Sequence, residues 1–302
     1  AVPVQGRAQH SGHAASRAMA ALSILAALTK LPISIASTLS AATGYVLFSR
    51  RLEAGMLTSG AGVVLAAMGA CAWNQLQDRR IDALMERTCR RPIPAGLVSV
   101  RTAFLIGALL VGSGASLLWF LHGAPAGLLT LAAAAWYNGV YTYLKRVWAL
   151  AVVPGALIGA LPPAIGWAAA GGSPLDPRIW ALSFFFFIWQ VPHFWLLLQV
   201  VGSEYSRAGL PSLQRLLGIR RMARLVSVWI WVTSVSSLLL PAYGLTTTLW
   251  AAAGLLVTAV WLGLEGTKLL RDRECPFLAT FRSINIYSLC VMSLLALDAI
   301  LS

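Results

Sequence analysis

Three oxygen-bearing side chains recur at four-residue spacing in the stretch WNQLQDRRID (73–82). Asn74, Asp78 and Asp82 stand at i, i+4 and i+8, so in a helix they fall within about 80° on one face. Two carboxylates and an amide oxygen suit Mg²⁺ when the phosphates of a substrate supply further ligands. The spacing therefore indicates a magnesium site at a wet helix end, where an apolar span meets the cytosol.

Arginines follow directly in LMERTCRRPIP (84–94). Arg87, Arg90 and Arg91 offer guanidinium groups that bind phosphate through paired hydrogen bonds. Acid, base and magnesium together indicate a diphosphate site. The alternative interpretation is a solvated loop in which Asp78 pairs with one of the two arginines that follow it.

Two more stretches carry charges beside apolar runs. YNGVYTYLKRVW (137–148) contains Tyr141, Lys145 and Arg146, which either meet a substrate or anchor the chain at the membrane surface. Glu204 is the acid of the stretch after a later span, and alone it is as well explained by solvation. Two acidic helix ends facing a basic loop would hold two magnesium ions across one diphosphate, stabilising a leaving group while an allylic cation forms.

An aromatic run, RIWALSFFFFIWQVPHFW (178–195), lies in one apolar segment. A carbocation needs a dry, aromatic-lined chamber, although the same enrichment is typical of lipid-facing packing. His193 lies within this run, where an ionisable residue suggests either a function or an interhelical hydrogen bond. Asp298, near the outer end of the last apolar run, is explained more simply by a side chain that reaches water.

The elements that must position these residues are membrane helices. The chain has 302 residues, of which 58% are hydrophobic and 11% charged, against about 25% charged in soluble domains. Breaks at charges, glycine and proline predict nine spans: 31–49, 55–77, 100–121, 124–143, 148–170, 179–200, 222–242, 245–264 and 281–301. The expected fold is therefore an all-α, polytopic membrane helical bundle with nine transmembrane helices.

Charge distribution predicts the orientation of this bundle. With a cytosolic N-terminus, all of the 23 lysines and arginines lie on the cytosolic side except Arg50, Arg51 and Arg178. The net charge of +13 thus reflects membrane topology, and no nucleic acid partner is expected. We expect a flexible cytosolic tail over 1–27 and a single transmembrane domain over 28–302. The four cysteines show no pairing or metal-like spacing.

The combination of motifs resembles the UbiA superfamily of membrane prenyltransferases, and within it the haem O synthases (protohaem IX farnesyltransferases). The stretch 74–92 is similar to the family pattern N-x-x-x-D-x-x-x-D followed by M-x-R-T-x-x-R-P. The resemblance covers about residues 28 to 301. Its further motifs follow in the family's order: LTKLPISIASTLSAATGY (28–45), YTYLKR (141–146), GALIGALPPAIGW (155–167), WQVPHF (189–194), EYSRAGLP (204–211) and FRSINIY (281–287).

The resemblance implies a set of site residues. The family folds as nine transmembrane helices around a chamber open to the cytosolic side, and binds farnesyl diphosphate through Mg²⁺. Glu204 stands where the family pattern has Asp. The implied magnesium ligands are Asn74, Asp78, Asp82 and Glu204, and the implied diphosphate-binding residues are Arg87, Arg91, Lys145 and Arg146. The implied catalytic residues are Asp78, Asp82 and Lys145. The residues implied at the haem acceptor are His193, Tyr141 and Trp189.

The implied reaction joins a farnesyl cation to a vinyl group of haem B, and water then adds to give haem O, the substrate of a haem A synthase partner. Two other functions remain open: prenylation of another aromatic acceptor, and a membrane haem-binding or assembly role without turnover. A transporter fits less well, because the charges cluster at one face. The expected location is the bacterial plasma (inner) membrane, multi-pass, with the active site toward the cytosol. The mitochondrial inner membrane is the alternative, which the lack of a strong Arg/Ser-rich transit peptide disfavours.

Overall fold

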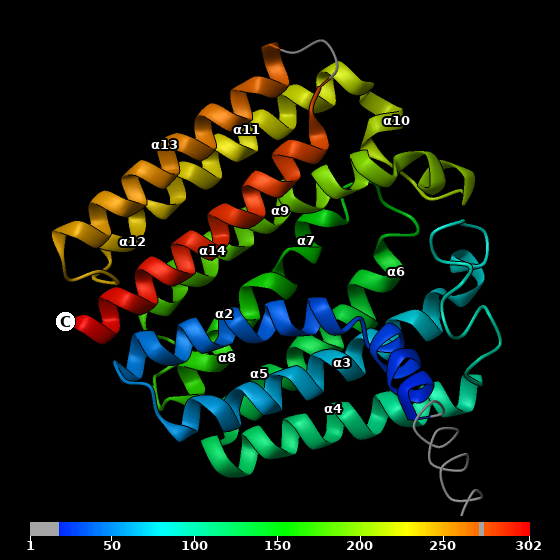
Figure 1. Ribbon diagram of the computed structural model, residues 1–302, viewed down its shortest axis with the longest axis horizontal. Helices are drawn as coiled ribbons and strands as arrows, with labels where there is room; N and C mark the ends of the chain where they lie inside the picture. The colour runs from blue at the N-terminus through cyan, green and yellow to red at the C-terminus, as the bar shows by residue number, and fades with distance from the viewer. Residues whose placement is uncertain (1–17, 272–274) are drawn as a thin grey trace, which may run out of the picture.

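A computed structural model describes residues 18–271 and 275–302, and within them every regular element is helical. The elements form one bundle (Figure 1). After a short helix at Ala18–Leu28, the helices are α2 Leu31–Ser49, α3 Ala54–Asp82, α4 Val100–His122, α5 Ala124–Ala135, the π-helix η1 Trp136–Tyr141, α6 Thr142–Leu144, α7 Val152–Gly155, α8 Leu157–Ala169, α9 Pro177–Arg207, α10 Leu213–Leu217, α11 Ile219–Ser237, α12 Leu239–Ala242, α13 Leu249–Arg271 and α14 Phe277–Leu301.

Within the described residues, eight helices are long and apolar enough to cross a membrane. They correspond to eight of the nine expected spans, so the all-α membrane bundle is confirmed. The remaining expected span, 124–143, is built by α5, η1 and α6 in succession. The count of nine and the side of the N-terminus stay predictions. Residues 1–17 of the expected tail lie outside the described residues, and 18–28 form the short helix.

Two groups of helices make up the bundle. One packs α2, α3, α4, α5 and α8 together, and the other packs α9, α11, α13 and α14. Contacts between α8 and α9 and between α2 and α14 join the groups (Figure 1). Consecutive long helices therefore run antiparallel across the apolar layer, and their polar connections meet at its two ends.

Small residues allow the tightest helix contacts. A Cβ at Gly44 of α2 would collide with the backbone carbonyl of Pro163 in α8, and one at Gly166 would collide with that of Ala41. Close backbone approach replaces the hydrophobic driving force that lipid cannot supply between helices. The α2–α8 contact thus fixes the wall next to α3, which carries the acidic residues.

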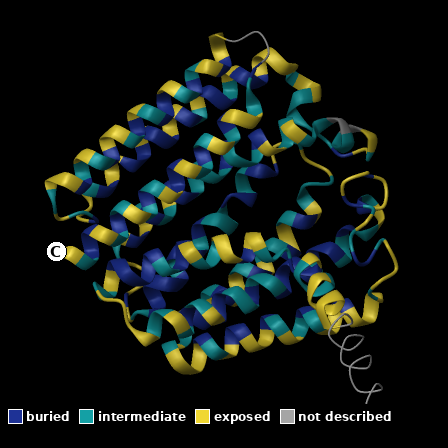
Figure 2. Ribbon diagram, in the orientation of Figure 1, coloured by how far each residue is buried: buried dark blue, intermediate teal, exposed yellow. Residues whose placement is uncertain are grey.

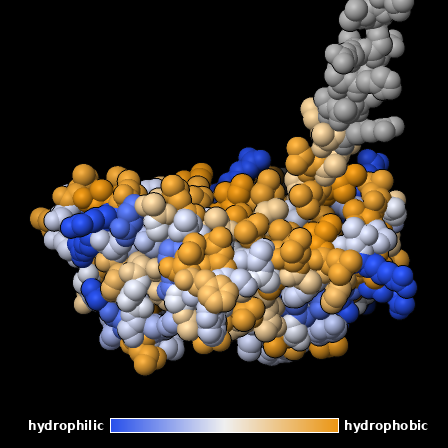
Figure 3. All heavy atoms as spheres, turned by 90° about the horizontal axis from the view of Figure 1, so that it is seen from below, coloured by the Kyte–Doolittle hydropathy of each residue, from blue (hydrophilic) through white to orange (hydrophobic). Residues whose placement is uncertain are grey.

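The surface is apolar around the bundle. Figure 2 shows exposed residues in stripes along the outer helices, with buried residues toward their neighbours. Figure 3 shows hydrophobic side chains over much of the visible face, and hydrophilic ones gathered toward the ends. This pattern is expected of a bundle whose sides contact lipid and whose ends contact water.

Candidate active site

The three predicted magnesium ligands lie on one buried face of α3. Asn74, Asp78 and Asp82 are 2%, 5% and 2% exposed, and Asn74 Nδ2 donates to Asp78 Oδ2 at 3.0 Å. The sequence suggests a wet helix end at this point, and the structure instead covers it with the 83–99 loop and with neighbouring helices. Buried carboxylates are costly unless they are paired, so their partners decide what they can do.

Asp78 pairs with the two bases that follow α6. Lys145 Nζ donates to Asp78 Oδ2, and Arg146 Nη2 lies 3.1 Å from Asp78 Oδ1 and 2.9 Å from the Gln77 carbonyl. The alternative of a solvated, intrahelical pair fails, because the adjacent Arg79 donates to the Leu76 carbonyl instead. The acid of α3 is therefore neutralised from another part of the chain.

Asp82 pairs with Arg91 from the 83–99 loop. Arg91 Nη1 lies 2.8 Å from both carboxylate oxygens of Asp82. Thr88 is fully buried, and its hydroxyl donates to the Asp82 carbonyl at 2.9 Å. Met85 and Ile93, 5% and 7% exposed, anchor the loop on both sides of Thr88. These contacts fold the loop back over the end of α3 and bring Arg91 to the carboxylate.

The π-helix η1 positions Lys145 and Arg146. The Thr142 hydroxyl donates to the carbonyl of Tyr137, five residues earlier, at 2.8 Å and accepts from Asn74 Nδ2 at 3.0 Å. Asn138 Nδ2 donates to the Ala70 carbonyl at 3.0 Å, which fastens η1 to α3. A π segment carries one extra residue in a turn and changes the direction of the side chains that follow. Here it aims the two bases at Asp78.

Glu204 lies at the end of α9 and faces Arg87 across the gap to the 83–99 loop. Arg87 Nε is 3.9 Å from Glu204 Oε2, which is an ion-pair distance without a hydrogen bond. Glu204 Oε2 is buried and has no hydrogen-bond partner. Beside this pair, Arg207 Nη1 contacts Glu86 Oε1 at 3.0 Å. Two reciprocal ion pairs thus join the loop to the end of α9.

Lys30 completes this charged cluster, although its role is not evident from the sequence. Its Nζ donates to Asn74 Oδ1 at 2.7 Å. Burial of the ammonium group is the main reason why the pKa of Lys30 falls to about 8. The only sequence signal is its place just before the first span, in LTKLP, where basic residues are common for reasons of topology.

An aromatic cluster adjoins the charged groups. Lys145 Nζ lies 5.7 Å from the centre of the Tyr141 ring, which stacks on Phe194 with centroids 6.1 Å apart. His193 follows, with its ring 5.7 Å from Phe194 and 4.7 Å from Trp189. Buried His193 Nδ1 has no hydrogen-bond partner. The three predicted acceptor residues, Tyr141, His193 and Trp189, are therefore connected to each other and to Lys145.

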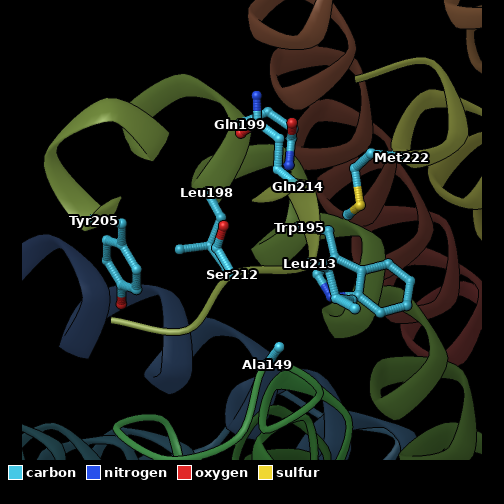
Figure 4. Close-up of a pocket in the computed structure, with 9 residues that line it drawn as sticks. All are labelled: Ala149, Trp195, Leu198, Gln199, Tyr205, Ser212, Leu213, Gln214 and Met222. Atoms are coloured by element: carbon cyan, nitrogen blue, oxygen red, sulfur yellow. The ribbon is translucent and has the colours of Figure 1, made fainter. Parts of the chain in front are cut away.

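A hollow of about 10 Å³ lies near the end of α9. Figure 4 shows Trp195 and Gln199 of α9 beside Gln214 from the segment that follows it. Tyr205 also lines this hollow, and burial of its hydroxyl raises the pKa of Tyr205 to about 12. The space fits about one water molecule. It is far too small for an aromatic acceptor, which has to bind elsewhere or after a movement of this segment.

Sequence comparison decides the family. The model of the UbiA prenyltransferase family matches residues 30–287. The chain belongs to this family. A protein of Geobacter sulfurreducens named protoheme IX farnesyltransferase is 42% identical over 214 residues, which are 70% of this chain and 78% of that protein. A protein of the same name from Oleidesulfovibrio alaskensis is 34% identical over 264 residues, 87% of this chain and 92% of that protein.

The fold of this UbiA prenyltransferase is shared with solved structures. A UbiA homolog from Archaeoglobus fulgidus, bound to GPP and Mg²⁺, superposes with a TM-score of 0.64 over 92% of this chain and 100% of that chain. The two sequences are 15% identical, so the likeness concerns the fold alone. The all-α arrangement described above is thus the arrangement of a known class of membrane prenyltransferases.

The residues of the charged cluster suit a magnesium ion that arrives with a phosphate-bearing substrate. Among the described residues, no three His, Cys, Asp or Glu side chains gather into a complete metal site. Mg²⁺ is typically held by one or two carboxylates together with waters and substrate phosphates. The unpartnered oxygen of Glu204 and the buried acids of α3 provide that kind of incomplete donor set.

Proposed function

We propose that this chain transfers the farnesyl group of farnesyl diphosphate to a vinyl group of haem B, producing haem O. The observation that carries the proposal is the pairing within the charged cluster. Each predicted acidic ligand contacts a base that is predicted to bind diphosphate: Asp78 with Lys145 and Arg146, Asp82 with Arg91, and Glu204 with Arg87. A substrate that brings both metal ions and phosphates satisfies both members of every pair.

The cluster as a whole favours an anion. Five bases, with Lys30 included, face three acids, so the site keeps a positive excess near the end of α3. Such an excess of partly buried positive charge raises the local concentration of a negatively charged substrate. Arg87 and Arg91 would each donate two hydrogen bonds to phosphate oxygens. Lys145 and Arg146 would contact the same phosphates from the opposite side.

Magnesium would be held by Asn74, Asp78 and Asp82 at one position and by Glu204 at a second. When bound, it supplies Lewis-acid stabilisation of the negative charge on the diphosphate leaving group. Lys145 would support the same leaving group with its ammonium, which lies 5.7 Å from the centre of the Tyr141 ring. No protein nucleophile is required for such a transfer.

The aromatic cluster would receive the farnesyl chain and the acceptor. Cleavage of the bond between the farnesyl carbon and the diphosphate oxygen leaves an allylic cation, which the faces of Tyr141 and Phe194 stabilise. The vinyl group of haem B forms the new carbon–carbon bond. Water then adds to the resulting cation and loses one proton, giving the hydroxyethylfarnesyl side chain. His193, with its unpartnered Nδ1, and Trp189 would contact the haem.

The choice of acceptor rests on the relatives named protoheme IX farnesyltransferase, since the geometry of the described residues supports a prenyl diphosphate and not a particular acceptor. We further propose that the protein lies in the bacterial plasma membrane with the charged cluster toward the cytosol, and that a haem A synthase consumes its product. The eight apolar helices establish a multi-pass membrane protein.

The test is a turnover assay of purified protein in detergent with haem B, farnesyl diphosphate and Mg²⁺, and with EDTA in a parallel sample. We expect a magnesium-dependent haem O peak by mass spectrometry. A prenylated hydroxybenzoate in place of haem O would favour the other aromatic acceptor. Haem binding by folded protein without any diphosphate release would favour the non-catalytic role.

A further inference from the structure

A second hollow lies on the outer wall of the bundle. Its volume is about 390 Å³, and it is lined by Leu76 of α3 and by Val100, Arg101, Phe104 and Leu105 of α4. Ligand sites in proteins typically enclose roughly 300–1,000 Å³. Phe104 and Leu105 are 53% and 64% exposed, so the hollow is an open groove that faces the surrounding lipid.

The groove forms where the close packing of α3 and α4 ends. A Cβ at Gly69 would lie 2.7 Å from the Gly107 carbonyl, so the two backbones almost touch there. One turn further, the indole of Trp73 occupies the contact, because Gly107 has no side chain. Trp73 Nε1 donates to the Phe104 carbonyl at 3.1 Å, and the two rings stack with centroids 6.2 Å apart. Beyond this indole lies the apolar groove.

The groove is separate from the active site. Leu76 lies two residues from both Asn74 and Asp78, which is about 200° around the helix axis. Thus α3 carries the charged cluster on one face and the groove on the opposite face. A molecule in the groove has no route to the reacting atoms across the helix, so it is not a substrate.

One cation stands at the groove. Arg101 is exposed, and no carboxylate among the described residues pairs with it. It lies in the first turn of α4, at the end of a membrane span, which is the depth of lipid headgroups. The indole of Trp73 is of the kind that gathers at this depth. An apolar groove with one unpaired cation at its headgroup end complements a lipid with a negative headgroup.

We propose that the groove binds one anionic phospholipid, with an acyl chain along Leu76, Phe104 and Leu105 and its phosphate at Arg101. The lipid fills the groove next to Trp73 and packs against the face of α3 that lies opposite the charged cluster. The occupant is a component of the membrane, and its binding does not depend on the proposed prenyl transfer.

Native mass spectrometry of delipidated, full-length protein tests this site. The protein is titrated with phosphatidylglycerol and, separately, with phosphatidylcholine of the same acyl chains. We expect one phosphatidylglycerol to bind more tightly than phosphatidylcholine. Arg101→Gln should weaken phosphatidylglycerol about fivefold, toward the affinity of phosphatidylcholine, because one basic residue near the headgroups contributes about 1 kcal/mol.

Two further variants make the result decisive. Leu105→Trp should fill the groove and weaken both lipids, while Arg51→Gln, an exposed arginine at the other end of the bundle, should change neither. Equal affinity of the two lipids for the unmodified protein would overturn the proposal, as would equal effects of Arg101→Gln and Arg51→Gln. Diphosphate release by Arg101→Gln should be normal, which separates a failure of this site from a failure of the proposed function.

Discussion

Both ends of the bundle bury a carboxylate, but the two carboxylates have different kinds of hydrogen-bond donors. Asp298 of α14 is fully buried and accepts hydrogen bonds from the backbone N–H groups of Thr247 and Thr248, at 2.7 and 3.1 Å, and from both of their hydroxyls. Asp78 of α3 is held by the cations of Lys145 and Arg146. One acid has neutral donors from a single turn, and the other has charged donors on long stems.

Under the proposed function, this difference separates a structural acid from a magnesium ligand. The donors around Asp298 come from two adjacent residues directly before α13, and two of them are backbone N–H groups. The cations around Asp78 lie on long side chains, and in the proposed reaction they would move to a phosphate when a metal ion takes their place. Burial alone therefore does not distinguish the two carboxylates, and the charge of their partners does.

The largest expected effect comes from the end that carries the charged cluster. Asp78→Asn keeps the size of the side chain and removes its charge, so it should lower turnover about 100-fold or more, by loss of leaving-group stabilisation. The measurement is diphosphate release with saturating farnesyl diphosphate and haem B. Asp82→Asn should behave similarly. Normal turnover in both variants would contradict the proposed metal ligands.

The same substitution at the other end is the matched control. Asp298→Asn should retain turnover per folded molecule, because no charged or aromatic site residue contacts this carboxylate. It should lower the free energy of unfolding by about 1–3 kcal/mol, since an amide cannot accept every hydrogen bond from Thr247 and Thr248. Thermal unfolding in detergent checks this, and an unchanged midpoint would show that the hydrogen bonds from Thr247 and Thr248 contribute little to stability.

A smaller effect is expected at Arg87, which is more exposed than the other bases of the charged cluster. Arg87→Ala should raise the KM for farnesyl diphosphate about tenfold and leave kcat nearly unchanged, because a charged hydrogen bond to phosphate contributes about 1.5 kcal/mol. Initial rates over a range of donor concentrations give both constants. An unchanged KM would rule out the role of Arg87 in binding the diphosphate.

The smallest effect on turnover is expected for the ion pair between Arg207 and Glu86, next to Arg87. Arg207 and Glu86 are 62% and 79% exposed, and exposed ion pairs contribute about 0–1 kcal/mol. Arg207→Ala should therefore change KM and kcat by less than about twofold. This variant removes the same type of side chain as Arg87→Ala from the same loop contact. Equal effects of the two substitutions would mean that loop closure, rather than contact with phosphate, explains both.

The sequence alone predicts the architecture well because lipid restricts it so strongly. Apolar runs define the spans, and the four-residue spacing of Asn74, Asp78 and Asp82 requires one shared face of a helix. The same spacing cannot show that a loop covers these carboxylates. Nor can it show that Asp298, near the end of a span, turns inward to Thr247 instead of reaching water. Both depend on contacts between elements distant in the chain.

The pairing of the charged residues also depends on such contacts. The sequence supplies acids and bases in the right stretches, but nothing in it assigns Lys145 to Asp78 or Arg91 to Asp82. Lys30 is indistinguishable from an ordinary topological charge until its ammonium is placed beside Asn74. The π-helix has no reliable signature in WYNGVY, because its hydrogen bonds to α3 stabilise it.

The π-helix has a consequence for how the chain can vary. Its extra residue acts as a spacer that sets the angular register of everything after it. If the same six residues, Trp136–Tyr141, wound as an ordinary α-helix, Lys145 and Arg146 would turn by about 100° about the helix axis. Deletion of one residue together with a return to α-helical winding would cancel this turn, whereas a substitution that only removes the hydrogen bonds between η1 and α3 would not. For both evolution and engineering, the side chains that hold this π turn against α3 are therefore more constrained than its length.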